Sequence, residues 1–475
     1  MAKIVCYYVC SECGRVEEHY QDKCPQCGKS KTLEKSILQN TGSEKTIKRE
    51  MRAYPSLNNI PSIPLKKLSD VQVIESIRFK TGLSEFDRVL GGGVMKGSSV
   101  LLGGEPGIGK STLLLQTISN LSSDHSVIYI SGEETDSQVK HRAERLGLNC
   151  DKINIFSSTK LASIVDLLWR ERPDVIVVDS LQTLSTSDID TSAGTGSQIK
   201  ACTAAITETI KLLGITMFIV AHVTKDGSIA GPKFAEHLVD TVLYFESAEG
   251  LLRVIRASKN RYGSSDEIGV FVMGEHGLSC IDDPSTSFAV PKRQGSIPPG
   301  IVNTAVIEGS RALFVELQVL CTPSKGQNRR VYSDKIDSSL VQRVVAILEN
   351  KTNINLGFSD IYVNVAGGIH LIDPAIELPL AVAIYTSYSN IEINKKVVYY
   401  GELTLIGEVR CPSFISKRNK IALSMGYNIG VYQGNEEERE INVLNISTLG
   451  MLENVIKELA KGSDESYSKV FDPKP

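Results

Sequence analysis

The stretch SSVLLGGEPGIGKSTLLLQTISN (98–120) constrains the fold more than any other part of the chain. An apolar run leads into a loop that fits G-x-x-x-x-G-K-[ST], and a helical pattern follows, which predicts a strand, a phosphate-binding loop and a helix aimed at an anion. In such a loop the backbone N–H groups surround the phosphates, Lys110 contacts the β- and γ-phosphates, and the Ser111 hydroxyl binds Mg²⁺. We therefore predict that ATP is bound by Gly104, Glu105, Pro106, Gly107, Ile108, Gly109, Lys110, Ser111 and Thr112.

Strand and helix patterns alternate after this loop. They run through SVIYIS (126–131), a helix that ends before Gly147, INIF (153–156), a helix over 161–171 and DVIVVD (174–179). Alternation of this kind predicts an α/β fold with a parallel-rich sheet.

Acidic residues follow two of these predicted strands. Asp179 ends VIVVD, where a carboxylate holds magnesium through water. Ser180 comes next, so the base that activates water must lie elsewhere. Carboxyl ends of parallel strands line the ligand crevice, and SVIYISGEE ends in Glu133 and Glu134. We assign Glu133 as the base and keep Glu134 as the alternative.

Composition sets the broad class of the chain. No run of about eighteen apolar residues would span a membrane, and the N-terminus lacks a secretory pattern, so we expect a cytoplasmic protein without membrane association. The formal net charge is −3, so any affinity for nucleic acid must come from local patches.

Two C-x-x-C pairs lie near the N-terminus, Cys10 with Cys13 and Cys24 with Cys27. Four thiolates at this spacing suit tetrahedral Zn²⁺ and predict a structural zinc site; disulfides or a rubredoxin-like iron are the alternatives. The polar residues 31–76 contain three prolines and are predicted to be a linker.

The segments TGLSEFDRVLGGGV (81–94), GEPGIGKS, SGEE, IVVDS, AHVTKDGSIAGP and KNRYG (259–263) occur in this order behind the cysteine pairs. Together they resemble the bacterial RadA/Sms DNA-repair family. The resemblance implies a RecA-like, DNA-stimulated ATPase that acts on branched recombination intermediates as a hexameric ring, with a RecA-type recombinase as a further partner. It also implies that Lys259 and Arg261 complete a neighbour's ATP site or communicate with DNA.

Two loops are the predicted DNA contacts within this ATPase. Residues 183–198 are rich in Ser, Thr, Gly and Asp, and a mobile loop there would face the centre of a ring. Residues 223–234 bring Lys225 and Lys233 amid glycines, directly after His222, which resembles a polar sensor of the γ-phosphate. Plain solvent-exposed connections are the alternative for both loops.

The back third of the chain resembles the proteolytic domain of Lon. The position of the nucleophilic serine in Lon matches Ala375 here, which has no oxygen with which to form an acyl intermediate. A basic cluster in this region is a candidate contact for DNA phosphates and comprises Lys325, Arg329, Arg330 and Lys335.

These observations predict five segments. They are a Cys₄ zinc module (1–30), a linker (31–76), a RecA-like ATPase domain (77–282), a Lon-protease-like domain without its nucleophile (283–462) and a disordered tail (463–475). The favoured function is a DNA-dependent ATPase that remodels or branch-migrates recombination intermediates in DNA repair. The alternatives are a Lon-like ATP-dependent protease, which Ala375 disfavours, and a zinc-knuckle scaffold that recruits a recombinase with nucleotide as a switch.

Overall fold

The structure is a computed structural model, and the chain divides into two compact units, Met1–Glu75 and Ser76–Pro475. The second unit is described at residues 78–222, 234–281, 283, 287–288, 295–324, 326, 329–434 and 441–461. The first is described at 5–10, 16–17, 21–24, 29–30 and 33–38. The predicted tail, 463–475, lies outside the described residues.

The first unit contains a small antiparallel sheet with strand order β2-β1-β3. Strand β1 (Val5–Cys10) pairs with β2 (Val16–Glu17) on one edge and with β3 (Leu33–Leu38) on the other. The limit predicted for this module, residue 30, is therefore too short. Because β3 completes the sheet, the module extends at least to Leu38, and the predicted linker cannot begin at 31.

The ATPase region of the second unit is built on a nine-stranded sheet. Six neighbouring strands, from β11 to β8, pair in parallel, and β12, β13 and β14 extend the sheet in antiparallel pairing. The predicted α/β, parallel-rich fold is confirmed. Across the sheet the strands are β14 (Gly277–Cys280), β13 (Ile268–Gly274), β12 (Leu252–Asn260), β11 (Thr241–Ser247), β6 (Ser99–Gly104), β10 (Thr216–His222), β9 (Val175–Asp179), β7 (Val127–Ser131) and β8 (Ile153–Ser157).

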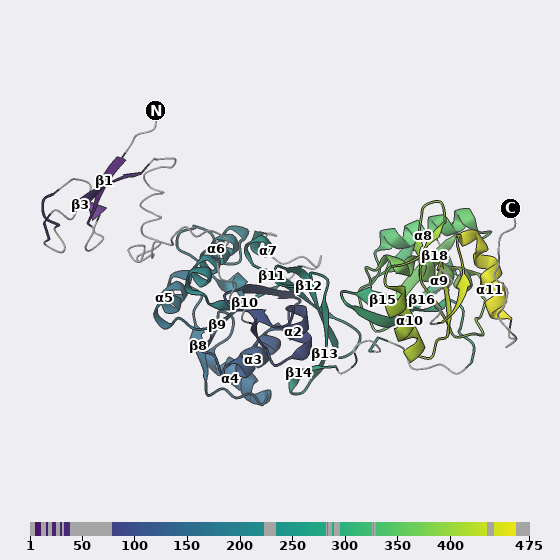
Figure 1. Cartoon of the computed structure of the whole chain (residues 1–475), viewed down its shortest axis with the longest axis horizontal. Coiled ribbons are helices and arrows are strands. Elements are labelled where there is room, and N and C mark those ends of the chain that lie inside the picture. Colours follow the sequence, from purple (N-terminus) through teal and green to yellow (C-terminus); the bar gives the residue numbers. More distant parts are fainter. Residues whose placement is uncertain are drawn as a thin grey trace. The chain divides into compact units, whose positions relative to one another are not determined.

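Helices cover both faces of this sheet (Figure 1). One face packs against α2 (Ser84–Val89), α3 (Lys110–Leu121) and α4 (Asp136–Arg145). The other packs against α5 (Leu161–Glu171), α6 (Gly196–Leu213) and α7 (Phe234–Leu238). Parallel strands buried on both faces are almost entirely apolar, as VIYIS and VIVVD are.

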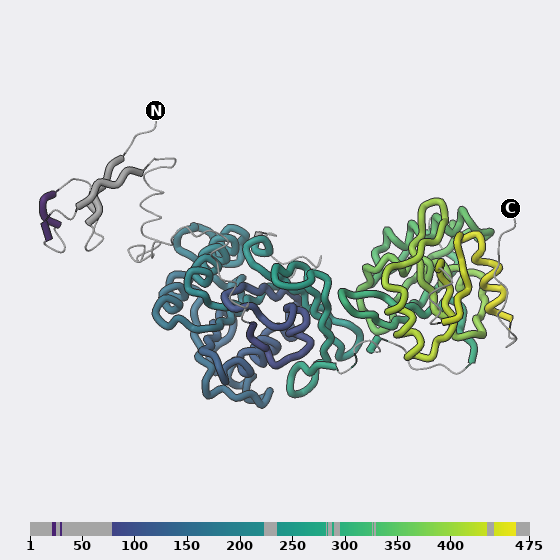
Figure 2. Tube along the Cα trace, in the orientation of Figure 1, coloured from purple at the N-terminus to yellow at the C-terminus, as the bar shows by residue number. Residues whose placement is uncertain are grey.

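Strands far apart in the sequence lie side by side in this sheet. The teal segment that contains β11 runs beside the purple-blue segment that contains β6 (Figure 2), with Thr241 opposite Val100 and Phe245 opposite Gly104. A short pair, β4 (Arg78–Phe79) and β5 (Val94–Met95), precedes β6.

A second, seven-stranded sheet forms the C-terminal region. Its order is β17 (Val331–Ser333), β18 (Ser359–Val365), β16 (Arg311–Pro323), β15 (Ile301–Glu308), β19 (Val397–Tyr399), β22 (Ile429–Tyr432) and β23 (Asn442–Asn445). A hairpin, β20 (Glu402–Leu403) with β21 (Val409–Arg410), stands apart from it. The helices are α8 (Ser338–Lys351), α9 (Glu377–Ser389), α10 (Ile415–Ser424) and α11 (Leu452–Ala460).

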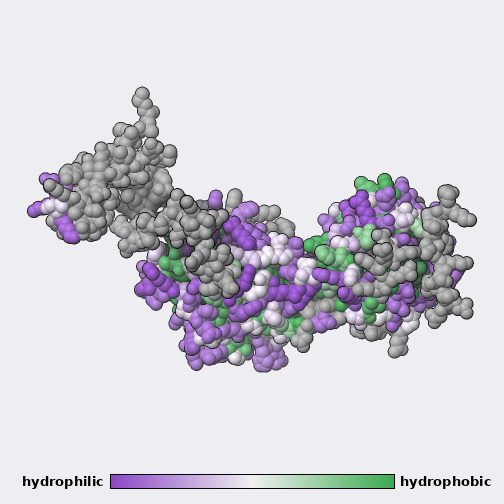
Figure 3. Space-filling model, viewed as in Figure 1, coloured by the Kyte–Doolittle hydropathy of each residue, from purple (hydrophilic) through white to green (hydrophobic). Residues whose placement is uncertain are grey.

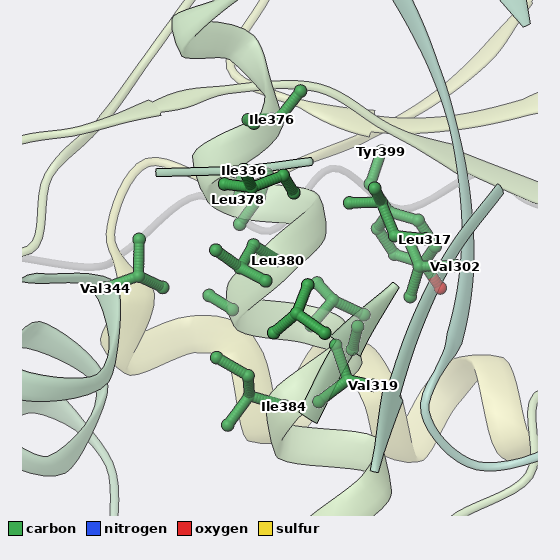
Figure 4. Packing of buried hydrophobic residues seen from close by; sticks show 14 of the residues in the cluster. Val302, Leu317, Val319, Ile336, Val344, Ile376, Leu378, Leu380, Ile384 and Tyr399 are labelled. Atoms are coloured by element: carbon green, nitrogen blue, oxygen red, sulfur yellow. The ribbon is translucent and has the colours of Figure 1, made fainter. Parts of the chain in front are cut away.

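Helix α9 is the centre of this C-terminal core. Its first ten residues are all buried, so the helix packs against other elements on every side. A helix at the protein surface would be buried along one apolar stripe only. Figure 4 shows Leu378, Leu380 and Ile384 of α9 near Val302 of β15 and Leu317 of β16, within one hydrophobic cluster.

Charged contacts join the ATPase region to the C-terminal region within the second unit. The Arg311 guanidinium binds both oxygens of the buried Glu85 carboxylate at 2.5 and 2.7 Å, and Arg256 of β12 pairs with the buried Glu308 of β15. The predicted boundary at 282/283 falls between β14 and β15, yet the two regions cluster as one compact unit.

On the side of the ATPase region that Figure 3 shows, hydrophilic residues predominate where residues are coloured. Within the described residues, no helix is both long enough and apolar enough to cross a membrane.

A buried ion pair fixes α10 in the C-terminal region. Arg418 is 1% exposed and donates to Asp373 Oδ2 at 2.7 Å and to the Ala305 carbonyl at 2.6 Å. Replacing Arg418 by methionine would leave the Asp373 carboxylate buried without its cation. We expect Arg418→Met to lower the free energy of unfolding of this region by about 3–5 kcal/mol.

Hydrogen exchange of α9 and α10 amides in the full chain would measure this loss. The matched control is Arg410→Met, because Arg410 is exposed on β21 and its loss should change stability by less than about 0.5 kcal/mol. If the α9 and α10 amides exchange equally slowly in Arg418→Met and Arg410→Met, the Arg418–Asp373 ion pair does not stabilise this region.

Candidate ATP-binding site

The phosphate-binding loop joins β6 to α3, and two of its glycines have left-handed backbones. Gly107 has φ 78° and Gly109 has φ 118°, conformations that disfavour residues with a Cβ atom. Gly109 is also the N-cap of α3, and no side chain caps this helix. The N–H groups of its first turn therefore lack a side-chain acceptor, which suits an anion such as phosphate.

Lys110 is buried at the start of α3. Its Nζ donates to the carbonyls of Gly104 and Glu105 at 2.7 and 2.8 Å and lies 3.5 Å from His222 Nδ1. Burial lowers the pKa of Lys110, although the carboxylates of Asp179 and Glu133 oppose the shift. The Lys110 ammonium is thus bound to two carbonyl oxygens of the loop, and phosphate oxygens of a bound nucleotide could replace them.

Parallel register brings the predicted catalytic residues to one edge of the sheet. Ser131 of β7 lies opposite Asp179 of β9, and His222 of β10 lies opposite Gly104 of β6. Glu133 follows β7, and its Oε1 accepts hydrogen bonds from His222 Nε2, at 2.9 Å, and from the Ser180 hydroxyl.

The neighbouring Glu134 has a different environment. Its Oε1 lies 2.5 Å from Arg142 Nη2 of α4, and its carbonyl accepts a bond from the Ser131 hydroxyl. Glu133 is therefore the glutamate that belongs to the cluster of Lys110, Asp179 and His222, while Glu134 precedes α4 and pairs with Arg142 of that helix.

Hydrogen bonds keep Glu133 ionised. Burial acts to raise its pKa, but the hydrogen bonds from Ser180 and His222, with the charges of His222 and Lys110, lower the pKa below its ordinary value. A carboxylate in this state can accept a proton or orient a water molecule at neutral pH.

Asp179 is 6% exposed and accepts a hydrogen bond from the Tyr129 hydroxyl at 2.5 Å. Magnesium on a nucleotide prefers oxygen ligands and takes one or two from the protein, the rest coming from phosphates and water. The Ser111 hydroxyl and the Asp179 carboxylate are donors of this kind. Among the described residues, no group of three His, Cys, Asp or Glu that could hold a metal occurs.

The structure gives the two cations of KNRYG different surroundings. Lys259 Nζ donates to the carbonyls of Glu236, His237 and Val239, at 2.8, 3.3 and 2.7 Å, and so caps the end of α7. Burial, with the nearby Arg261 charge, lowers the pKa of Lys259. Arg261, by contrast, keeps a side chain that is 56% exposed, 3.7 Å from Asp240.

The predicted DNA loop at 183–198 is organised around one buried side chain. Gln198, which is 1% exposed, donates to the carbonyls of Thr186, Ile189 and Thr191 and accepts from the Thr186 N–H. The loop is therefore hydrogen-bonded to the start of α6 through Gln198, and its contact with DNA stays a prediction. The second predicted loop, with Lys225 and Lys233, lies outside the described residues.

The predicted zinc ligands are only partly described. Cys24 is 1% exposed, and its N–H donates to the Lys29 carbonyl at 2.9 Å. Cys10 ends strand β1, whose side chains are outside the described part, as are Cys13 and Cys27. The zinc site stays a prediction.

Comparison with known proteins identifies the family. The family model described as the KaiC ATPase matches residues 79–172. The chain is 42% identical over 431 residues to the DNA repair protein RadA of Bacillus subtilis, covering 90% of this chain and 92% of the relative. It is 39% identical over 421 residues to RadA of Treponema pallidum, covering 89% and 90%. The chain belongs to the RadA family of DNA repair proteins.

A third relative covers even more of the chain. RadA of Streptococcus pyogenes is 38% identical over 463 residues, which is 96% of this chain and 100% of the relative. Among solved structures, a KaiC-like protein from Pyrococcus horikoshii matches 43% of this chain and 99% of its own, with 19% identity and a TM-score of 0.37. The RadA resemblance and the RecA-like ATPase fold predicted from the motifs are confirmed.

The different surroundings of Lys259 and Arg261 lead to a stability prediction. Lys259→Ala removes a charged donor from three carbonyls and should lower the free energy of unfolding by about 2 kcal/mol. Arg261→Ala, two positions away, should change it by less than about 0.5 kcal/mol, since the side chain is exposed. Thermal unfolding and hydrogen exchange of the α7 amides would measure both.

The reverse order of effects would contradict the capping role of Lys259. Exchange outside α7 serves as the internal reference, because neither substitution should change the protection of α3.

Proposed function

We propose that the chain hydrolyses Mg²⁺-ATP and uses the energy to move or remodel DNA strands in recombination intermediates, as a homo-oligomeric ring. The observation that carries this proposal is the cluster of Lys110, Glu133, Asp179 and His222 beside the uncapped start of α3. Membership of the RadA family supports the ATPase and its place in DNA repair.

Each residue of the cluster has a role in this mechanism. Lys110 would exchange its two carbonyl partners for the β- and γ-phosphates. The Ser111 hydroxyl and Asp179 would hold Mg²⁺, which would supply positive charge beside the phosphates. Glu133 orients the attacking water, and His222, which contacts both Glu133 and Lys110, responds to the γ-phosphate. Glu134 is not needed for this chemistry, because Arg142 neutralises it.

Arg261 is the residue that we propose to complete the ATP site of a neighbouring copy. It is exposed, whereas Lys259 is engaged with α7 in its own chain. A guanidinium supplied in trans stabilises charge on the transferred phosphoryl group. A hexameric ring would place one such arginine at each interface, and the mass of the assembly with nucleotide would test this.

The C-terminal region offers a candidate DNA contact. Arg330 is exposed, and its Nη1 lies 3.5 Å from the hydroxyl of Tyr332, which stacks on Tyr362 with ring centroids 4.7 Å apart. Both tyrosines are exposed and border a cavity of about 540 Å³. A cation beside exposed aromatic rings suits single-stranded DNA. Arg329 is less available, because it pairs with Glu349 at 2.9 Å.

Peptide hydrolysis is a weaker second function. Ala375 is buried, and its N–H donates to Asp373, which is bound to Arg418. A guanidinium has no lone pair that accepts a proton, so Arg418 cannot activate a nucleophile as a catalytic lysine does. Casein cleavage by the purified chain would revive this alternative.

Turnover with and without single-stranded DNA tests the proposed function. We expect DNA to stimulate ATP hydrolysis and Lys110→Ala to abolish it. Glu133→Gln should lower kcat by about 100-fold or more, because water loses its base. Glu134→Gln, the matched control one residue away, should stay within about threefold of the unchanged chain, since Glu134 lies outside the cluster.

Two results would overturn parts of this proposal. If single-stranded DNA leaves the rate of ATP hydrolysis unchanged and the chain displaces no strand, the alternative of a scaffold with nucleotide as a switch is favoured. A larger loss in Glu134→Gln than in Glu133→Gln would reverse the assignment of the base.

Salt dependence tests the C-terminal DNA contact. Arg330→Ala should reduce the slope of log affinity against log salt by about one, because one phosphate contact is lost. Tyr332→Ala should weaken binding by about 1–3 kcal/mol and leave the slope unchanged, because stacking releases no counterions. Fluorescence anisotropy with single-stranded DNA measures both effects, and Arg329→Ala is the charge-matched control. Equal slopes for Arg330→Ala and the unchanged chain would place the DNA elsewhere.

A further inference from the structure

One tyrosine stands out in the buried strand β7. Its sequence, VIYIS, is aliphatic except for Tyr129 and the final serine, and Tyr129 is 1% exposed. The side chain belongs to the cluster between the sheet and α3, the face on which the phosphate-binding helix lies. A buried phenolic hydroxyl requires a hydrogen-bond partner, and a phenylalanine would fill the same space without that requirement.

The partner of this hydroxyl is the Asp179 carboxylate. Tyr129 lies opposite Val177, and Ser131 lies opposite Asp179, so Tyr129 and Asp179 are diagonal neighbours on one face of adjacent strands. The hydroxyl donates to Asp179 Oδ2 at 2.5 Å. The phenolic hydroxyl is the donor of this pair, because an ionised carboxylate only accepts hydrogen bonds.

We propose that Tyr129 is a positioning residue for magnesium, which orients the Asp179 carboxylate through this hydrogen bond. This inference rests on the proposed role of Asp179. With Oδ2 bound by Tyr129, the carboxylate keeps its other oxygen, Oδ1, in a fixed orientation, and this oxygen would be the one available to a magnesium ion or its water. Hydrogen-bond partners behind metal-binding carboxylates fix their orientation, and their loss weakens metal affinity by about 10- to 100-fold.

Neighbouring groups do not replace this hydrogen bond. Ser180 and His222 donate to Glu133, and Arg142 binds Glu134, so each of these three donors already binds a carboxylate other than Asp179. Within the described residues, the hydrogen bond from Tyr129 is the one that the Asp179 side chain accepts. Tyr129→Phe therefore removes the orientation of Asp179 without disturbing the other carboxylates.

Binding of a fluorescent, non-hydrolysable ATP analogue, titrated with Mg²⁺, tests this inference without catalysis. For Tyr129→Phe we expect an affinity in EDTA within about twofold of the unchanged chain and a half-saturating Mg²⁺ concentration raised about tenfold. Tyr400→Phe is the matched control, because Tyr400 is also fully buried and its hydroxyl donates to the Arg418 carbonyl, in the C-terminal region. Its Mg²⁺ dependence should not change.

A second substitution keeps the test decisive if the phenylalanine variant folds poorly. Incorporation of 4-aminophenylalanine at position 129 retains a donor at the same place on the ring and should restore the normal Mg²⁺ dependence. A Tyr129→Phe chain with normal Mg²⁺ dependence would overturn the inference, as would a 4-aminophenylalanine chain that behaves like a folded Tyr129→Phe chain.

Asp179→Asn separates this inference from the proposed function. If Asp179→Asn raises the Mg²⁺ requirement and Tyr129→Phe does not, only the role of Tyr129 is wrong. If Asp179→Asn itself leaves the Mg²⁺ requirement unchanged, the proposed role of Asp179 fails, and the inference fails with it. Adding Tyr129→Phe to Asp179→Asn should have no further effect, because both changes act on one contact.

Discussion

Parallel pairing of β6, β10, β9 and β7 is the constraint on which the candidate site depends. Strands that run in one direction end at one edge of the sheet, so residues separated by long stretches of sequence meet there. The loop after β6 supplies Lys110, β7 is followed by Glu133, and β9 and β10 end in Asp179 and His222. Because both faces of these strands are buried under helices, this edge is where polar side chains can gather without disturbing the core.

The same rule explains how much of the site could be predicted from the sequence. A spaced motif predicted Lys110, and acidic residues after predicted strands predicted Asp179 and Glu133, because strand direction alone determines that they meet. The sequence favoured Glu133 over Glu134, and side-chain geometry shows that the two glutamates have different partners. Arg142 lies eight positions beyond Glu134, on a helix that turns back over the loop, and a sequence without coordinates does not show this contact.

Other features had weaker signals in the sequence. KNRYG indicated functional cations. A short basic motif does not distinguish a lysine that caps a helix from an exposed arginine. The structure makes this distinction, because pairing of β12 with β11 brings Lys259 to the end of α7. The extent of the N-terminal module was underestimated because half of LEKSIL, which forms β3, is polar or charged, and the segment lies among linker-like residues. Tyr129 could have been noticed in the sequence, because it is a tyrosine within an otherwise aliphatic buried strand.

The charged cluster at the candidate ATP site and the Arg418–Asp373 ion pair differ in how easily their contacts can be exchanged. Glu133 and His222 have side chains that are 38% and 28% exposed, so water reaches them and an incoming phosphate can take over their partners at little desolvation cost. Arg418 and Asp373 are 1% and 7% exposed, and separating them would leave two buried charges. One centre is therefore suited to cycles of binding and release. The other, beside Ala375, is suited to holding the C-terminal core in a single arrangement.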